Sequence, residues 1–290
     1  MFHEFLLSMA YCADQTLAII AISTGLLGLS AGILGAFAFA QNQGMLGDAI
    51  SHAALPGAVL AFLCTHSTNA LLLCSGGMAS AVIGILFIEL IVVFSLLRRD
   101  AAIAVVLSVF FGIGLVLLTI ARKYPLHGQS LLNRLLFGNA ATITIDDLYA
   151  IATVTIVLMT IVFLLWKEFL IVVFDHHYAQ TLGLRSSAGV IVLMLSIVTI
   201  VSIGLQTTGG ILMSTLLLAP AAAARQWTTR FSHFVFLAGF FGMMGAMIGS
   251  FMSALVDQLP TGPAIVLVVG AILTVSLLFG CGAHVQVRGL

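Results

Sequence analysis

The sequence predicts an all-α integral membrane protein that crosses the bilayer eight or nine times. Hydrophobic residues make up 61% of its 290 residues, charged residues only 7%, and the mean hydropathy is +1.23. A soluble domain carries roughly 25% charged residues, so this chain cannot cover a water-facing surface of its size. The apolar residues also fall into runs long enough to cross a bilayer as helices. We expect residues 1–290 to form a single transmembrane domain.

Nine apolar runs have roughly the length of a membrane-spanning helix. They are 17–40, 46–66, 72–97, 101–121, 147–167, 188–206, 210–226, 232–255 and 263–282. The second and seventh runs are the weakest, because Asp48, His52 and Pro56 interrupt the second and Pro220 interrupts the seventh. If either of these two is short or broken, eight spanning helices remain.

Basic residues predict the orientation. In the nine-segment topology, seven Lys and Arg residues fall on one side and three on the other. Cytoplasmic loops carry an excess of Lys and Arg, so the first side is expected to be cytoplasmic, with the C-terminus inside and the N-terminus outside. The larger set is Arg98, Arg99, Lys167, Arg185, Arg225, Arg230 and Arg288, and the smaller set is Arg122, Lys123 and Arg134.

Two groups of glycines have the spacing of helix contact faces. Small residues three or four positions apart let two helix backbones approach closely in lipid. The groups are Gly25, Gly28, Gly32 and Gly35, and Gly242, Gly245 and Gly249. The alternative is that glycine is simply common in membrane helices.

An aspartate and a histidine lie four residues apart in the apolar stretch GDAISHAALPG, residues 47–57. Residues i and i+4 share one face of a helix, so Asp48 and His52 can direct an oxygen and a nitrogen at one point. An ionised aspartate at membrane depth costs about 2.5–3.5 kcal/mol, which calls for a function. Mixed oxygen and nitrogen donors without thiolate favour Mn²⁺, Zn²⁺ or Fe²⁺. The pair therefore predicts a metal site, and the alternative is an ion pair near the membrane interface.

Two protein ligands make a loose site, whereas structural zinc sites have four. A loose site suits transport, because the ion must be released. If the protein dimerises around a pore, two such pairs would supply four ligands. We therefore expect a transported divalent ion and no permanently bound cofactor.

Other polar residues have weaker signals. Glu89 is a second carboxylate inside an apolar run, and we favour a helix contact for it over a role in the transport pathway. Cys12, Cys64, Cys74 and Cys281 form no CxxC motif, so they are interpreted as apolar filler, although Cys64 and Cys74 could pair across a short loop. The zero net charge suggests no nucleic-acid partner.

A short amphipathic stretch in the cytoplasmic connection 167–187 predicts a docking helix. Asp175 suits a helix N-cap and Gly183 a C-terminal stop. Phe174, Tyr178, Leu182 and Leu184 give the stretch an apolar edge. It is too short to span the bilayer, so a partner protein is expected to grip it.

Five blocks of the sequence resemble the membrane permeases of bacterial manganese, zinc and iron ABC importers. In chain order they are GMLGDAISHAALPGAVLAF, RRDAAIAVVLSVFFGIGLVLL, LLNRLLFGNAATITIDDL, FDHHYAQTLGL and GLQTTGGILMSTLLLAPAAAAR. Together they extend the similarity over about residues 17–280. The stretch AQNQGML departs from the pattern, because the family usually has basic residues there.

The resemblance implies the fold and partners of a type II ABC importer. It implies eight spanning helices, a second permease copy or sister permease, two cytoplasmic ATP-binding subunits and an extracytoplasmic metal-binding protein in a bacterial inner membrane. The family's pathway residues match Asp48 and His52. Its ATPase-docking block, about residues 174–186, matches Asp175, Tyr178, Ala179, Leu182 and Gly183.

Two other classes of function remain open from the residues alone. A secondary metal transporter or channel could use the same pair without ATP, although a docking helix argues against it. An intramembrane enzyme could use the pair for acid–base or metal chemistry, but no Walker A or HExxH motif is present. The sequence does not distinguish Mn²⁺, Zn²⁺ and Fe²⁺, since Asp and His serve all three.

Overall fold

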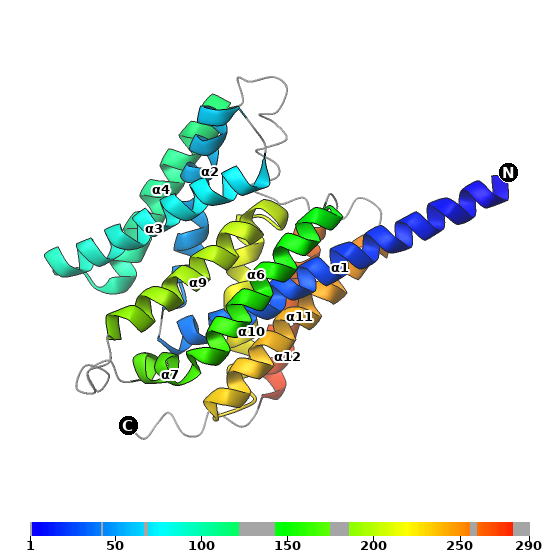
Figure 1. Ribbon diagram of the computed structural model, residues 1–290. Coiled ribbons are helices and arrows are strands. Elements are labelled where there is room, and N and C mark those ends of the chain that lie inside the picture. Colours follow the sequence, from blue (N-terminus) through cyan, green and yellow to red (C-terminus); the bar gives the residue numbers. More distant parts are fainter. Residues whose placement is uncertain are drawn as a thin grey trace.

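In the computed structural model, the described residues 2–41, 43–66, 69–121, 143–174, 186–255 and 260–280 are almost entirely helical (Figure 1). The helices are α1 (Phe2–Ala40), α2 (Leu46–Thr65), α3 (Ala70–Phe94), α4 (Arg99–Ala121), α6 (Ile145–Leu164), α7 (Trp166–Phe174), α9 (Ser186–Thr207), α10 (Gly210–Arg225), α11 (Phe231–Leu255) and α12 (Thr261–Phe279). The all-α prediction is confirmed for this part of the chain, where no strand occurs.

Eight of these helices are long and apolar enough to cross a membrane, so the lower of the two predicted numbers holds for the described ranges. The weak second run is a full span, Leu46–Thr65, and its helix continues through Pro56 and Gly57. The seventh run is the short one. Its 16 residues reach about 24 Å, less than the roughly 30 Å of the hydrocarbon core.

Local sequence signals set several helix boundaries. Thr144 and Asp147 form a capping box at the start of α6, in which each side chain accepts a hydrogen bond from the other residue's backbone N–H. Gly209 has φ 87°, a left-handed value that favours glycine, and it turns the chain from α9 into α10. The helix of the first span begins at Phe2, well before the predicted start at residue 17. Near residue 165 the predicted span 147–167 divides into α6 and the separate helix α7.

The predicted glycine faces are helix contacts. A methyl group added at Gly28 would overlap the carbonyl oxygen of Gly242, and one at Gly32 would overlap that of Ala238. These contacts join α1 and α11 in antiparallel directions, and the Thr24 and Ser250 hydroxyls hydrogen-bond across the same interface at 2.7 Å. The glycines of α11 also form a contact face for α12, since Gly249 lies against Ile265.

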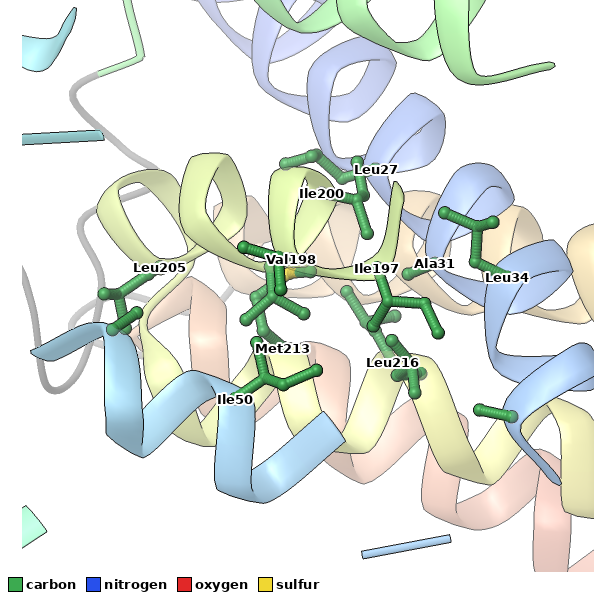
Figure 2. Close-up of a cluster of buried hydrophobic side chains, with 14 of the residues drawn as sticks. Leu27, Ala31, Leu34, Ile50, Ile197, Val198, Ile200, Leu205, Met213 and Leu216 are labelled. Atoms are coloured by element: carbon green, nitrogen blue, oxygen red, sulfur yellow. The ribbon is translucent and has the colours of Figure 1, made fainter. Parts of the chain in front are cut away.

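The main hydrophobic core forms where α1, α2, α9 and α10 meet (Figure 2). Leu27, Ala31 and Leu34 from α1 face Ile197 and Ile200 from α9, with Met213 and Leu216 from α10 and Ile50 from α2 completing the cluster. Further residues of α2 also belong to this core, and α2 packs along α3 and α4 as well. These three helices form a group at one side of the bundle (Figure 1). The short helix α10 thus holds one side of α2 in place.

All five Lys and Arg residues of the described segments lie at one end of the bundle (Figure 1). They are Arg98, Arg99, Lys167, Arg225 and Arg230, at the α3–α4 junction, in α7 and at the α10–α11 junction. Although α10 is short, it returns the chain to this end of the bundle. The helix α11 therefore begins at the same end as in the nine-segment topology. The predicted orientation stays a prediction, with this basic end as the expected cytoplasmic side.

Candidate functional site

The helix that carries Asp48 and His52 is the most enclosed of the eight spans. Of the residues in its most apolar window, 72% are buried, compared with 22% in α3 and α4. It also has the lowest hydropathy of the eight. A helix of this kind lies inside a bundle, where polar side chains avoid lipid.

Asp48 and His52 meet on one face of α2, as their spacing predicts. The His52 Nε2 and Asp48 Oδ1 atoms are 3.3 Å apart. Two donors at that separation can share one ion at about 2.1 Å with a donor–metal–donor angle of roughly 104°, close to tetrahedral. The same distance suits an ion pair when no metal is bound, so the geometry is compatible with both interpretations.

Residues from two other helices surround the pair. The Phe111 ring on α4 lies edge-on to the His52 imidazole, with ring centroids 4.6 Å apart. The Ser214 side chain on α10 lies within hydrogen-bonding reach of the Asp48 carboxylate. Sequence reasoning missed both residues, because nothing in their local patterns links them to α2. Ser51, which is adjacent in sequence, is buried and donates its hydroxyl to the Gly47 carbonyl instead.

Pro56 interrupts the backbone hydrogen bonding of α2 one turn after the pair. Proline has no N–H, so it donates no helical hydrogen bond to the carbonyl of His52, four residues earlier. The backbone oxygen of His52 therefore receives no helical hydrogen bond from position 56.

The chain's own helices cover the pair only in part. The exposed fraction is 37% for the Asp48 side chain and 19% for the His52 side chain. Met45, Leu60 and Leu63 are further exposed or half-exposed positions on this side of α2 and its N-cap. Asp48, the more exposed of the two, is therefore accessible from outside the single chain.

One chain offers few ligands for a metal. Within the described ranges, no group of three or more His, Cys, Asp and Glu side chains could hold a metal ion together. Among these residues the site thus has two strong ligands per copy, Asp48 and His52. A complete coordination shell requires donors from water or from another chain.

Glu89 has a local partner. Its carboxylate accepts a hydrogen bond from the Arg99 guanidinium, which joins α3 to the start of α4. This confirms the helix contact that we favoured for Glu89. Cys64 and Cys74 form no disulfide in the structure, so the alternative of a bond between them is not realised.

The predicted docking residues Asp175, Tyr178, Ala179, Leu182 and Gly183 lie outside the described residues. The described chain reaches this segment through α7, which ends at Phe174. The Phe174 ring contacts Phe231 of α11 at 5.2 Å between centroids, and Phe231 contacts Phe37 of α1 at 5.4 Å. An aromatic cluster thus links the end of α7 to the end of α1, five residues before α2 begins.

Comparison with known proteins gives a consistent result. Residues 13–280 match the model of a family described as the ABC 3 transport family. The chain is 39% identical over 268 residues to the zinc transport system membrane protein TroC of Treponema pallidum, covering 92% of this chain and 90% of the relative. It is 38% identical over 246 residues to the manganese transport system membrane protein MntC of Bacillus subtilis, covering 84% of this chain and 56% of that longer relative.

A solved structure has the same fold. The chain is similar to PsaBC from Streptococcus pneumoniae in complex with Fab, with a TM-score of 0.83, 24% sequence identity and 98% coverage of both chains. A structure described as an inward-facing conformation of a metal-chelate type ABC transporter is more distant, with a TM-score of 0.64 and 14% identity.

Proposed function

This chain belongs to the ABC 3 transport family and is a membrane permease subunit of a metal ABC importer. From this premise we propose that Asp48 and His52 hold the metal ion in transit. The observation that carries the proposal is the pair of donors 3.3 Å apart on a partly exposed side of the most enclosed helix. The cargo is Mn²⁺, Zn²⁺ or Fe²⁺, because oxygen and imidazole donors suit all three ions.

The incomplete ligand set supports a second permease, either another copy or a sister chain, as the source of the remaining ligands. Two α2 helices facing each other would bring together two carboxylates and two imidazoles. Neither chain alone would then hold the ion tightly, and separation of the two pairs would release it. This gives alternating access around a site between the two chains.

The energy for this motion comes from separate cytoplasmic ATP-binding subunits, and an extracytoplasmic metal-binding protein delivers the ion. The described residues offer the aromatic cluster of Phe174, Phe231 and Phe37 as a rigid connection between the docking segment and α1. Because α1 leads directly into α2, movement of the docking segment would reach the Asp48–His52 pair. We place the protein in a bacterial inner membrane as a multi-pass subunit without catalytic activity of its own.

Co-purification tests this function against its alternative. We expect the full-length chain, extracted from its native membrane in mild detergent, to bring down an ATP-binding subunit, and reconstituted metal uptake to require ATP. Metal flux through the chain alone, without nucleotide, would instead establish an ATP-independent transporter or channel.

Charged substitutions in the docking segment are expected to separate ATP hydrolysis from transport. The double variant Tyr178→Asp, Leu182→Asp should lose at least about tenfold in uptake, because a charge opposite an apolar partner surface destabilises the contact by more than about 1.4 kcal/mol. The measurement is metal uptake together with stimulated ATPase activity. Tyr149→Asp is the matched control, since Tyr149 is exposed at the opposite end of α6 from α7. Wild-type values of both activities in the double variant would show that no partner docks there.

A further inference from the structure

A cavity of about 560 Å³ lies between α3, α7, α9 and the connection from α1 to α2, away from Asp48 and His52. Its walls are apolar, with Val82 and Leu86 on α3 opposite Ile191 and Leu195 on α9. Leu195 also borders a second, apolar cavity of about 320 Å³ between α6 and α9. The volume of the first cavity falls in the range of roughly 300–1,000 Å³ found for ligand pockets.

One end of the larger cavity is polar. Gln41, Gln43, Glu89 and Arg99 line it there, so an acid, a base and two amides lie together. Gln41 and Gln43 belong to the stretch AQNQGML that departs from the family pattern. The cavity thus combines a charged end with an apolar body.

Two polar atoms at this end have no hydrogen-bond partner in the structure. Gln43 is only 9% exposed, and its Oε1 atom is unpartnered, as is Nε of Arg99. The backbone of Gln43 is already satisfied, since its N–H donates to Ala38 and its carbonyl accepts from Leu46. A buried amide without a partner is costly, so a bound group that supplies hydrogen bonds would be stabilised here.

The polarity of the cavity changes with depth in the membrane in the same way as that of a lipid molecule. Glu89 and Arg99 flank the α3–α4 junction at the basic end of the bundle, where headgroups lie. Val82 is twelve residues before the end of α3, about 18 Å deeper into the bilayer. The polar end therefore lies at the interface, and the apolar walls extend toward the membrane centre.

We propose that this cavity binds a phosphatidylethanolamine molecule from the adjacent leaflet. Its phosphate contacts Arg99, its ammonium group donates to Glu89 and Gln43, and an acyl chain lies between α3 and α9. The Glu89 and Arg99 side chains are 44% and 36% exposed, so both remain open to a ligand while paired with each other. A zwitterionic headgroup complements this acid–base pair, whereas an anionic headgroup would also meet the Glu89 carboxylate.

Retention of lipid tests the proposal. The full-length chain, in the assembly in which it purifies, is reconstituted into vesicles of equal parts phosphatidylethanolamine and phosphatidylcholine, extracted again, and its bound lipid measured by mass spectrometry. Phosphatidylcholine carries the same phosphate but no N–H donor. We expect phosphatidylethanolamine to be retained about three- to tenfold over phosphatidylcholine, the effect of one or two hydrogen bonds.

Two variants distinguish the contribution of the lipid headgroup contacts from that of the apolar cavity wall. Gln43→Leu removes an acceptor that has no protein partner, and it should abolish the preference between the two lipids. Ile191→Trp fills the apolar body and should lower retention of both, whereas Leu267→Trp, on the exposed side of α12, should change neither.

Three results would overturn the proposal. They are equal retention of the two lipids by the unmodified chain, a wild-type preference in Gln43→Leu, and equal losses in Ile191→Trp and Leu267→Trp. The last result would mean that the retained lipid is only the loosely bound shell around the protein. A second permease chain covering the cavity would give the same absence of a lipid preference.

Discussion

Metal accumulation is expected to fall to background in cells that carry either Asp48→Ala or His52→Ala. Each substitution removes one of the two strong donors that a chain contributes. If two copies of this chain share the ion, it removes two of four ligands, and loss of a single ligand already costs a metal site much of its affinity. The measurement is accumulated metal per cell, with membrane levels of each variant checked by blot.

Ser51→Ala is the matched control for this experiment. Ser51 lies between the two ligands in sequence, yet its hydroxyl bonds to the Gly47 carbonyl and is buried away from the pair. We expect this variant to accumulate metal normally. If both alanine variants of the pair also accumulate metal normally, Asp48 and His52 are a structural ion pair and the cargo crosses elsewhere.

The same variants report on the cargo. His52→Ala should impair Zn²⁺ uptake more than Mn²⁺ uptake, because imidazole is the more zinc-suited donor. A proton pathway would behave differently, since Asp48→Glu or a change of pH would then restore transport without regard to the metal. Uptake of each ion at two pH values distinguishes these cases.

The second large effect is expected from Gly28→Leu, which should sharply reduce the yield of folded protein. Even a methyl group at this position would overlap the Gly242 carbonyl oxygen on α11, and that atom belongs to the backbone and cannot rotate away. The two helices form the most extensive helix pair in the described part of the chain, so separating them weakens many contacts. Overpacking of this kind costs about 3 kcal/mol, a large share of the stability of a typical domain.

Gly270→Leu provides the control for size and hydrophobicity. Gly270 is within α12, and a Cβ atom added there would meet no atom within 4 Å. We expect this variant to express, purify and unfold at the wild-type temperature. Size-exclusion profiles and thermal unfolding in detergent compare the two variants. A Gly28→Leu protein as stable as Gly270→Leu would show that α1 and α11 are not closely packed at this point.

The sequence by itself determined the features that depend on local composition and short spacing. Membrane-length apolar runs predict spanning helices because the bilayer requires them, and seven of the nine expected runs needed no special argument. The spacing of Asp48 and His52 predicted their contact, since four residues make one turn of a helix. The glycine spacings likewise identified contact faces, because they describe a single helix surface.

The tertiary structure decided what depends on residues far apart in the chain. It selected the seventh run as the short helix, although Asp48, His52 and Pro56 interrupt the second run and Pro220 interrupts the seventh. It also brought Phe111 and Ser214 to the pair and Arg99 to Glu89. No local pattern links such residues, because the helices that carry them meet only when apolar faces and small residues from distant segments pack together. The cavity beside Gln43 has the same origin, since its walls come from five separate parts of the chain.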